Sequence, residues 1–146
     1  MIEAVSEKNF EEVLPLIRRY QEFYKVANIS DSKNRDFFSQ FGESNSAGCL
    51  FIFRLDGNAV AFATVYFSYA SSIASKVGIM NDLYTTPEIR GQGVGRQLIE
   101  HCHTFASKNG AARLQWTTAT DNEKAQKLYD SMGAKKSTWH VYTYST

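Results

Sequence analysis

A glycine-rich turn, Arg90-Gly91-Gln92-Gly93-Val94-Gly95-Arg96, is the feature that most constrains this 146-residue chain. It joins a strand-like stretch that ends near Thr85 to a helix-like stretch that starts near Val94. Glycine lets the backbone approach an anion closely, and the first free N–H groups of a helix point at that anion with the positive end of the helix dipole. The two flanking arginines supply donors for charge-assisted hydrogen bonds. The turn therefore predicts an anion site, with a plain strand-to-helix connection as the alternative.

Two common phosphate-binding loops do not fit this turn. A dinucleotide site needs G-x-G-x-x-G after the first strand of a βαβ unit, and a Walker A loop ends in Gly-Lys-Ser/Thr. In this chain Gly95 is followed by Arg96-Gln97-Leu98. The sequence therefore predicts neither loop.

Two helices are predicted near the N-terminus. Apolar residues recur at helical spacing behind a candidate cap, Ser6, and Pro15 marks either a kink or the first turn of this helix. A second, shorter helix is expected to begin at Asp31 or Ser32. The polar, glycine-bounded stretch 42–48 follows and is expected to be an internal loop.

Three strands are predicted between this loop and the glycine-rich turn. Cys49–Leu55 and Ala59–Tyr69 are rich in apolar and aromatic residues, and the hairpin signal Asp56-Gly57-Asn58 separates them. Lys76–Thr85 continues the pattern and stops at Thr86-Pro87-Glu88, where proline cannot donate to a sheet ladder. These stretches are expected to form antiparallel strands.

The C-terminal third is expected to form a helix, a strand, a second helix and a last strand. Val94 lies at the start of the first helix, and Arg113–Thr118 is the expected strand. Asn122 is expected to cap the second helix, and the last strand is expected around Thr138–Tyr144. The whole order predicts one α+β domain, residues 1–146, with a mixed, mostly antiparallel central sheet flanked by helices.

Composition argues against several classes of protein. The formal net charge is +1 and no block of like charges is present, which does not favour a nucleic-acid partner. The N-terminus lacks a basic region followed by an apolar one, and no apolar run is long enough to span a membrane, so we expect a cytoplasmic protein without a membrane partner. Cys49 and Cys102 lie outside any metal-like cluster and are expected to be reduced and buried.

Two motifs, in the same order, resemble one enzyme family. Asn81-Asp82-Leu83-Tyr84-Thr85-Thr86-Pro87-Glu88-Ile89, continued by the glycine-rich turn, resembles the signature of GNAT N-acetyltransferases, a strand L-x-V and then P-E-x-R-G-x-G-[IV]-G. Downstream, Asn122-Glu123-Lys124-Ala125-Gln126-Lys127-Leu128-Tyr129, ending in Met132-Gly133-Ala134, is similar to the family segment N-x-x-A-x-x-L/F-Y-x-x-x-G-[FA]. The resemblance spans 76–134 and is closest to the small histone and polyamine-type members.

This resemblance implies acetyl-CoA as the co-substrate, without a metal. The backbone of Leu83, Tyr84 and Thr85 would pair with pantetheine as if it were an extra strand, and one of these N–H groups would polarise the thioester carbonyl. The glycine-rich turn, Arg90–Arg96, would bind the pyrophosphate. Asn122 would meet the cofactor while it caps its helix.

The resemblance and the residues together give candidates for catalysis and acceptor binding. Tyr129 stands where the family places the acid that protonates the departing thiolate, with a core tyrosine as the alternative. Asp82 is a candidate for binding a cationic amine or relaying a proton, with a strand carboxylate paired elsewhere as the alternative. Tyr20 and Tyr24 are candidates for lining the acceptor site. Similar polyamine-type enzymes carry Glu-Asp where this chain has Asn81 before Asp82, so polyamine specificity is not predicted.

Taken together, the resemblance implies an enzyme that moves an acetyl group from acetyl-CoA to a primary amine of a small molecule or peptide, with a homodimer as an expectation. A non-catalytic acyl-CoA-binding sensor or interaction module of the same fold is the alternative, and a nucleotide-phosphate binder is a third hypothesis. The sequence does not name the acceptor. Polyamines, amino acids, aminoglycosides and protein N-termini are all compatible with it.

Overall fold

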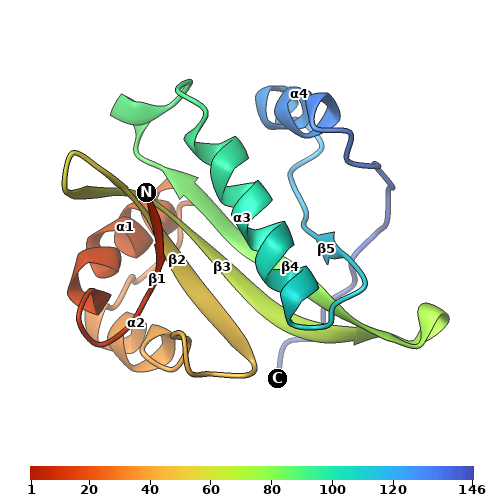
Figure 1. Cartoon of the computed structure of the whole chain (residues 1–146), viewed down its shortest axis with the longest axis horizontal. Coiled ribbons are helices and arrows are strands. Elements are labelled where there is room, and N and C mark those ends of the chain that lie inside the picture. Colours follow the sequence, from red (N-terminus) through yellow and green to blue (C-terminus); the bar gives the residue numbers. More distant parts are fainter. The chain divides into compact units, whose positions relative to one another are not determined.

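The computed structural model describes all 146 residues, which divide into two compact units, Met1–Trp116 and Thr117–Thr146. The larger unit is built on a five-stranded sheet with the spatial order β1-β2-β3-β4-β5 (Figure 1). Its elements are β1 (Ile2–Ala4), α1 (Phe10–Phe23), α2 (Asp31–Phe38), β2 (Gly48–Leu55), β3 (Asn58–Ala70), η1 (Ser71–Ile73), β4 (Ser75–Thr85), η2 (Pro87–Ile89), α3 (Val94–Lys108) and β5 (Leu114–Gln115). The smaller unit contains α4 (Glu123–Ser131). This is the predicted α+β class with a mostly antiparallel sheet.

The predicted hairpin joins β2 to β3. Its central residues, Asp56 and Gly57, have φ values of 50° and 82°. Positive φ at both positions is what a two-residue turn needs to match the twist of its strands. The strands then pair antiparallel from Leu55 opposite Asn58 to Gly48 opposite Tyr66. The hairpin prediction is confirmed.

The third predicted strand, β4, pairs with β3 through a β-bulge. Thr64 lies opposite Asp82 and Val65 lies opposite Met80, so Asn81 has no counterpart on β3. A bulge of this kind bends the strand and changes the direction of neighbouring side chains. It lies at the centre of β4, directly before the L-x-V-like stretch.

On its other side β4 has a short parallel neighbour. β5 pairs with β4 only at Gly78 and Ile79. The strand predicted over Arg113–Thr118 is therefore much shorter than expected. Beyond Ile79 the edge of β4 that faces away from β3 is not covered by β5.

Helices cover both faces of this sheet. Val13 and Ile17 of α1 belong to the same buried cluster as Leu50 and Ile52 of β2. Phe51, between those two strand residues, contacts Phe105 of α3 at a ring distance of 4.9 Å. Because successive strand residues point to opposite faces, α1 and α3 lie on opposite faces of the sheet. Figure 1 shows α3 crossing in front of β3 and β4.

The N-terminal helices begin close to the predicted positions. Asn9, rather than Ser6, precedes the first turn of α1, and its side-chain oxygen accepts a hydrogen bond from the Ser6 N–H at 2.8 Å. The predicted Ser6 cap is therefore wrong, because Asn9 folds its side chain back over this turn. Pro15 lies inside α1. Ser30 caps α2, where its hydroxyl accepts from the Lys33 N–H at 3.2 Å.

The two ends of the chain differ from what the sequence predicts. The short N-terminal strand β1 was not predicted, and it pairs antiparallel with β2. The strand expected over Thr138–Tyr144 is wrong, since residues 135–146 form neither helix nor strand. Trp139 and Tyr144 in that segment are 83% and 99% exposed. A strand-like pattern forms a strand only where a neighbouring edge accepts its hydrogen bonds, and this segment pairs with no strand.

The smaller unit is organised around α4. Asn122 caps this helix, because its side-chain oxygen accepts a hydrogen bond from the Ala125 N–H at 3.2 Å. The helix ends before Gly133, which has a φ of 80° and so adopts the left-handed conformation common after helix ends. The cap at Asn122 is as predicted. No helix of the structure is long and apolar enough to cross a membrane.

Candidate active site

The N-terminus of α3 is built to meet an anion. Gly93 precedes the helix with a φ of 82°, and no side chain caps this end. Gly91 has the same φ, and a Cβ atom at either glycine would meet no other atom within 4 Å. The first N–H groups of a helix have no partner within the helix. The turn therefore leaves open space in front of backbone donors, which fits the pyrophosphate of coenzyme A.

The edge of β4 next to this turn fits a second part of the same ligand. Leu83, Tyr84 and Thr85 pair with β3 on one side, whereas β5 reaches only Gly78 and Ile79 on the other. Backbone N–H and C=O groups on an uncovered edge are ready to pair with an extended chain. Pantetheine contains amides and is of this kind.

Asp82 is a buried carboxylate on the α1 face of β4. Its side chain is only 6% exposed, and its Oδ2 atom has no hydrogen-bond partner. The other oxygen, Oδ1, accepts a hydrogen bond from the Asn81 amide at 3.2 Å. Opposite Asp82 on β3, the Thr64 side chain is fully buried and its hydroxyl also lacks a partner. Unpaired buried polar groups of this kind cost about 1–3 kcal/mol each, which makes this pair a candidate ligand-binding site.

The charge of Asp82 affects the pKa of two tyrosines. Burial, together with the negative charge of Asp82, raises the pKa of the Tyr20 hydroxyl well above its ordinary value. The same two causes raise the pKa of Tyr66. Both phenols therefore remain protonated at physiological pH. They place neutral hydroxyl groups, which can form hydrogen bonds, near the carboxylate.

Aromatic rings extend from this carboxylate toward the end of α1. Tyr20 contacts Tyr24 at a ring distance of 4.9 Å and Tyr84 at 6.2 Å. Phe23 contacts Tyr24 at 5.2 Å. Phe23 and Tyr24 are more than half exposed. The structure therefore brings the predicted Tyr20, Tyr24 and Asp82 together on one face of the sheet.

Arg90 lies on this same face. Its guanidinium carbon is 5.4 Å from the ring centre of Phe23 and 5.5 Å from that of Tyr84. Its Nε atom donates to the Thr85 carbonyl oxygen at 2.9 Å. The side chain of Arg90 is thus oriented by aromatic rings at the α1 side of the glycine-rich turn.

Thr64 and Tyr66 are the residues of this cluster that sequence reasoning missed. Both lie on β3, which was predicted correctly as a strand. Their position beside Asp82 depends on the register between β3 and β4, and the bulge at Asn81 shifts that register. The alternation of side chains along β3 was the available signal, but it did not reveal which β4 residue would lie opposite.

Tyr129 and Asn122 lie in the smaller unit, on α4. Tyr129 is partly buried, in the last turn of the helix. Asn122 is engaged as the helix cap. Their roles toward a ligand remain predictions.

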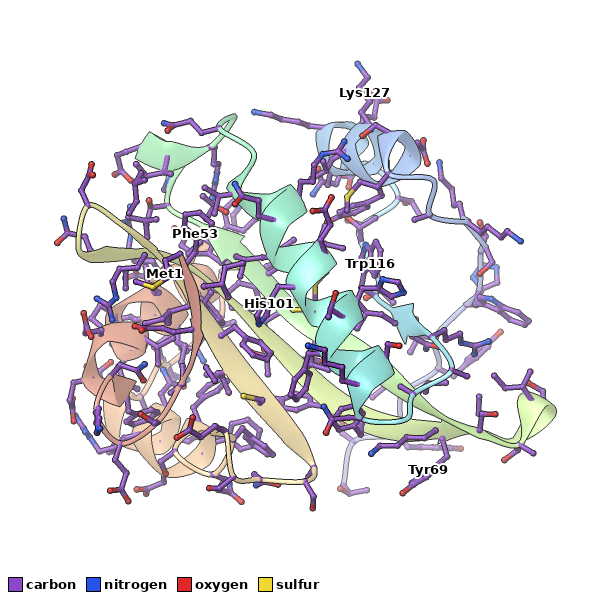
Figure 2. All side chains as sticks on the ribbon, viewed as in Figure 1. Met1, Phe53, Tyr69, His101, Trp116 and Lys127 are labelled. Carbon is purple, nitrogen blue, oxygen red and sulfur yellow. The ribbon has the colours of Figure 1, made fainter.

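Other polar groups take structural roles. A hollow of about 470 Å³ is lined by Glu3, Glu12 and Arg54 among others, and Arg54 pairs with both of these glutamates. His101 packs against Phe51 at a ring distance of 4.7 Å, between α3 and the sheet (Figure 2). None of these residues belongs to the Asp82 cluster.

The two cysteines are buried thiols. Burial raises the pKa of Cys49 to about 11 and that of Cys102 to about 12. Only the thiolate is nucleophilic. These groups therefore do not supply a nucleophile at physiological pH.

The chain matches the model of the acetyltransferase (GNAT) family over residues 13–134. It is 28% identical over 156 aligned positions to a thialysine N-epsilon-acetyltransferase of Bos taurus, covering 99% of this chain and 91% of that protein. It is 30% identical over 136 positions to the D-amino-acid N-acetyltransferase HPA3 of Saccharomyces cerevisiae, covering 92% and 84%. A crystal structure of a probable acetyltransferase superposes with a TM-score of 0.86 at 27% identity, covering 100% of this chain and 97% of that one.

The glycine-rich N-terminus of α3 and the uncovered edge of β4 both lie within the residues that match the family model. The chain therefore belongs to the acetyltransferase (GNAT) family and is an acyl-CoA-dependent N-acetyltransferase.

Proposed function

We propose that this enzyme transfers the acetyl group of acetyl-CoA to the primary amine of a small molecule by direct attack. The observation that carries the proposal is the uncapped, glycine-lined N-terminus of α3 beside the uncovered edge of β4. The first feature supports a pyrophosphate and the second an amide-bearing chain leading away from it. Coenzyme A has both parts: a pyrophosphate, and the pantetheine arm attached to it, which contains amides.

The acceptor amine must lose a proton before it attacks. A primary amine has a pKa near ~10, comparable to that of a lysine side chain, and is therefore mostly protonated at neutral pH. In the proposed site the Asp82 carboxylate binds this ammonium group through its unpartnered Oδ2 atom. The released proton passes to Asp82 or, through it, to water.

In the next step the neutral amine nitrogen forms a bond with the thioester carbonyl carbon. The carbonyl oxygen becomes an oxyanion, which a backbone N–H among Leu83, Tyr84 and Thr85 stabilises. The bond between carbon and sulfur then breaks, and the thiolate of coenzyme A takes a proton from the hydroxyl of Tyr129. The nitrogen, which is positively charged after the attack, loses its second proton to water as the amide forms, and a proton from water restores the Tyr129 hydroxyl. The products are the acetylated amine and free coenzyme A.

The named relatives support an amine acceptor of small size. One is named for thialysine and the other for D-amino acids, and both of these compounds carry a primary amine. We therefore place small amino acids first among the candidate acceptors.

A thermal-shift comparison of acetyl-CoA, ATP and NAD tests the donor assignment. We expect acetyl-CoA to raise the melting temperature in proportion to its concentration above Kd, as for any ligand that binds only the folded state. ATP and NAD are expected to have little effect. A shift with ATP or NAD and none with acetyl-CoA would overturn the proposal.

A further inference from the structure

Thr64 keeps a hydroxyl group at a position where a hydrocarbon side chain would pack equally well. Its side chain is fully buried in the middle of β3, and its Oγ1 atom has no hydrogen-bond partner. Valine has nearly the same shape without the hydroxyl, so Thr64→Val would remove a buried unpaired group at little cost in packing. The stability of the fold therefore does not account for this hydroxyl.

The hydroxyl lies beside the second unpaired group of the site. Thr64 and Asp82 are direct partners in the antiparallel pairing of β3 with β4. Side chains at such positions point to the same face of the sheet, with Cβ atoms about 4.5–5.5 Å apart. No hydrogen bond joins the two groups, since Oγ1 of Thr64 and Oδ2 of Asp82 both lack a partner. One nitrogen atom, at ~2.9 Å from each, reaches two acceptor atoms that are up to about 5 Å apart.

Aromatic rings surround these two acceptors on the α1 face of the sheet. Phe62 and Tyr84 are the next pair along the two strands, and their ring centres lie 6.4 Å apart. Tyr20 of α1 contacts Phe62 at a ring distance of 5.6 Å and Tyr84 at 6.2 Å. Asp82 is only 6% exposed beside these rings. A nitrogen bound here is therefore largely removed from water, and its N–H groups need acceptors within the protein.

The number of acceptors matches the number of N–H groups on one kind of nitrogen. The attacking nitrogen is neutral, and a neutral primary amine has two N–H groups and one lone pair. Asp82 offers one acceptor through Oδ2, and Thr64 offers another because a hydroxyl carries two lone pairs beside its own proton. A neutral secondary amine has a single N–H group, so it would leave one of the two buried oxygen atoms without a partner.

We propose that Thr64 binds the acceptor amine together with Asp82 and selects primary over secondary amines. The ammonium group gives one proton to Oδ2 of Asp82, and Asp82 passes that proton to water. The neutral nitrogen then donates one N–H to Asp82 and the other to Thr64. Its lone pair points away from both oxygen atoms and is free to attack the thioester carbonyl carbon. This inference rests on the proposed amine acetylation and adds the orientation of the amine and its degree of substitution.

The test compares primary amines with their N-methyl derivatives: glycine with N-methylglycine, L-alanine with N-methyl-L-alanine, and L-lysine with Nε-methyl-L-lysine. We measure kcat/KM for each pair in the wild-type enzyme and in the Thr64→Val, Thr64→Ser and Thr104→Val variants. We expect the wild type to prefer the primary amine. In Thr64→Val the ratio of the two kcat/KM values should fall about 10- to 100-fold, because the primary amine loses a buried hydrogen bond and the secondary amine loses none.

Two variants separate hydrogen bonding from packing. Thr64→Ser keeps the hydroxyl and removes only a methyl group, so it should keep the wild-type ratio. Thr104→Val, at an exposed position of α3, is the matched control and should change neither the ratio nor the rates. The melting temperature of Thr64→Val should not fall, since an unpaired buried hydroxyl is removed.

The outcomes separate this inference from the proposed function. A ratio that stays unchanged in Thr64→Val, whether or not both rates fall, would overturn the inference, because Thr64 would then not touch the amine. Equal use of primary and secondary amines by the wild type would overturn this inference and leave amine acetylation standing. Turnover of none of these amines would overturn the proposed function and this inference with it.

Discussion

Asp82 buries one carboxylate oxygen that has no hydrogen-bond partner, next to a Thr64 hydroxyl in the same condition. This arrangement does not stabilise the fold, since each unpaired buried group lowers the free energy of unfolding. An incoming ammonium group would satisfy both oxygen atoms. We therefore propose that the cluster serves binding rather than stability.

Replacing Asp82 with asparagine removes the charge and keeps the size of the side chain. A hydrogen bond to a charged group is worth about 1.5–3 kcal/mol, so kcat/KM for the acceptor is expected to fall about 10- to 100-fold. The melting temperature should not fall, because a buried charge is removed. Steady-state kinetics and thermal unfolding measure the two effects. Asp36→Asn, at an exposed position of α2, is the matched control, and an equal loss in that variant would contradict the role of Asp82.

The tyrosines around Asp82 give a pH-dependent signal. Burial and the charge of Asp82 raise the pKa of Tyr20 and Tyr66 above the unfolded value of ~10. Their contribution to stability is therefore fully present below pH ~10 and is lost as the pH rises through their folded pKa values. In Asp82→Asn, one of the two causes is gone, and both tyrosines should titrate at lower pH than in the wild type.

The phenolate absorbance of the folded protein measures this titration. Because the chain has eight tyrosines, Tyr20→Phe and Tyr66→Phe variants identify the two late-titrating groups. Superimposable titration curves of wild type and Asp82→Asn would show that the carboxylate does not act on these rings.

Tyr129 carries the acid role in the proposed reaction. General acid catalysis contributes typically about 10²- to 10⁴-fold, so Tyr129→Phe should lower kcat at least ~100-fold. Acetyl-CoA affinity, measured by calorimetry, should change little because the ring remains. Tyr69→Phe is the control, since Tyr69 is 79% exposed at the far end of β3 (Figure 2). An unchanged kcat in Tyr129→Phe, with chemistry rate-limiting, would remove Tyr129 from the mechanism.

Among the elements, the N-terminus of α3 is the proposed binding site of the donor. Gly93 before α3 and Gly110 after it have φ values of 82° and 83°, and a Cβ at either would meet no atom within 4 Å. Alanine at either position should therefore cost a similar amount, about 1–2 kcal/mol for a left-handed residue. Only Gly93→Ala places a methyl group at the proposed anion site. This variant is expected to lower the affinity for acetyl-CoA at least ~10-fold. Thermal unfolding and calorimetry compare the pair, and equal acetyl-CoA affinities would argue against this helix end as the pyrophosphate site.

The elements that could be predicted are those whose signals are local. The hairpin of β2 and β3 follows from two residues, Asp56 and Gly57, and the start of α3 follows from Gly93. The bulge at Asn81 and the short β5 depend on how separate strands fit together. No stretch of sequence carries that information by itself, so the bulge and the length of β5 were not predicted.

The same limit applies to the candidate site. Asp82, Tyr20 and Tyr24 were predicted from their place in a motif and at a helix end, and the structure brings them together. Thr64 and Tyr66 were missed because only the register of β3 against β4 brings them to Asp82. The aromatic surroundings of Arg90 were missed for a related reason, since they combine residues from α1 and β4.

At the scale of the whole molecule, the proposed reaction uses both compact units. The glycine-rich turn, the edge of β4 and the Asp82 cluster lie within Met1–Trp116, whereas Asn122 and Tyr129 lie within Thr117–Thr146. A single domain over 1–146 stays a prediction. The proposal therefore predicts that catalysis requires the intact chain.

Thiol release from acetyl-CoA by the intact chain, measured across a panel of primary amines together with the mass of each product, tests the central claim most directly. The proposal predicts that free coenzyme A and acetylated amine appear in equal amounts, with small amino acids among the best acceptors. Tight binding of acetyl-CoA with no thiol release for any amine would contradict it and would identify the chain as an acyl-CoA-binding module.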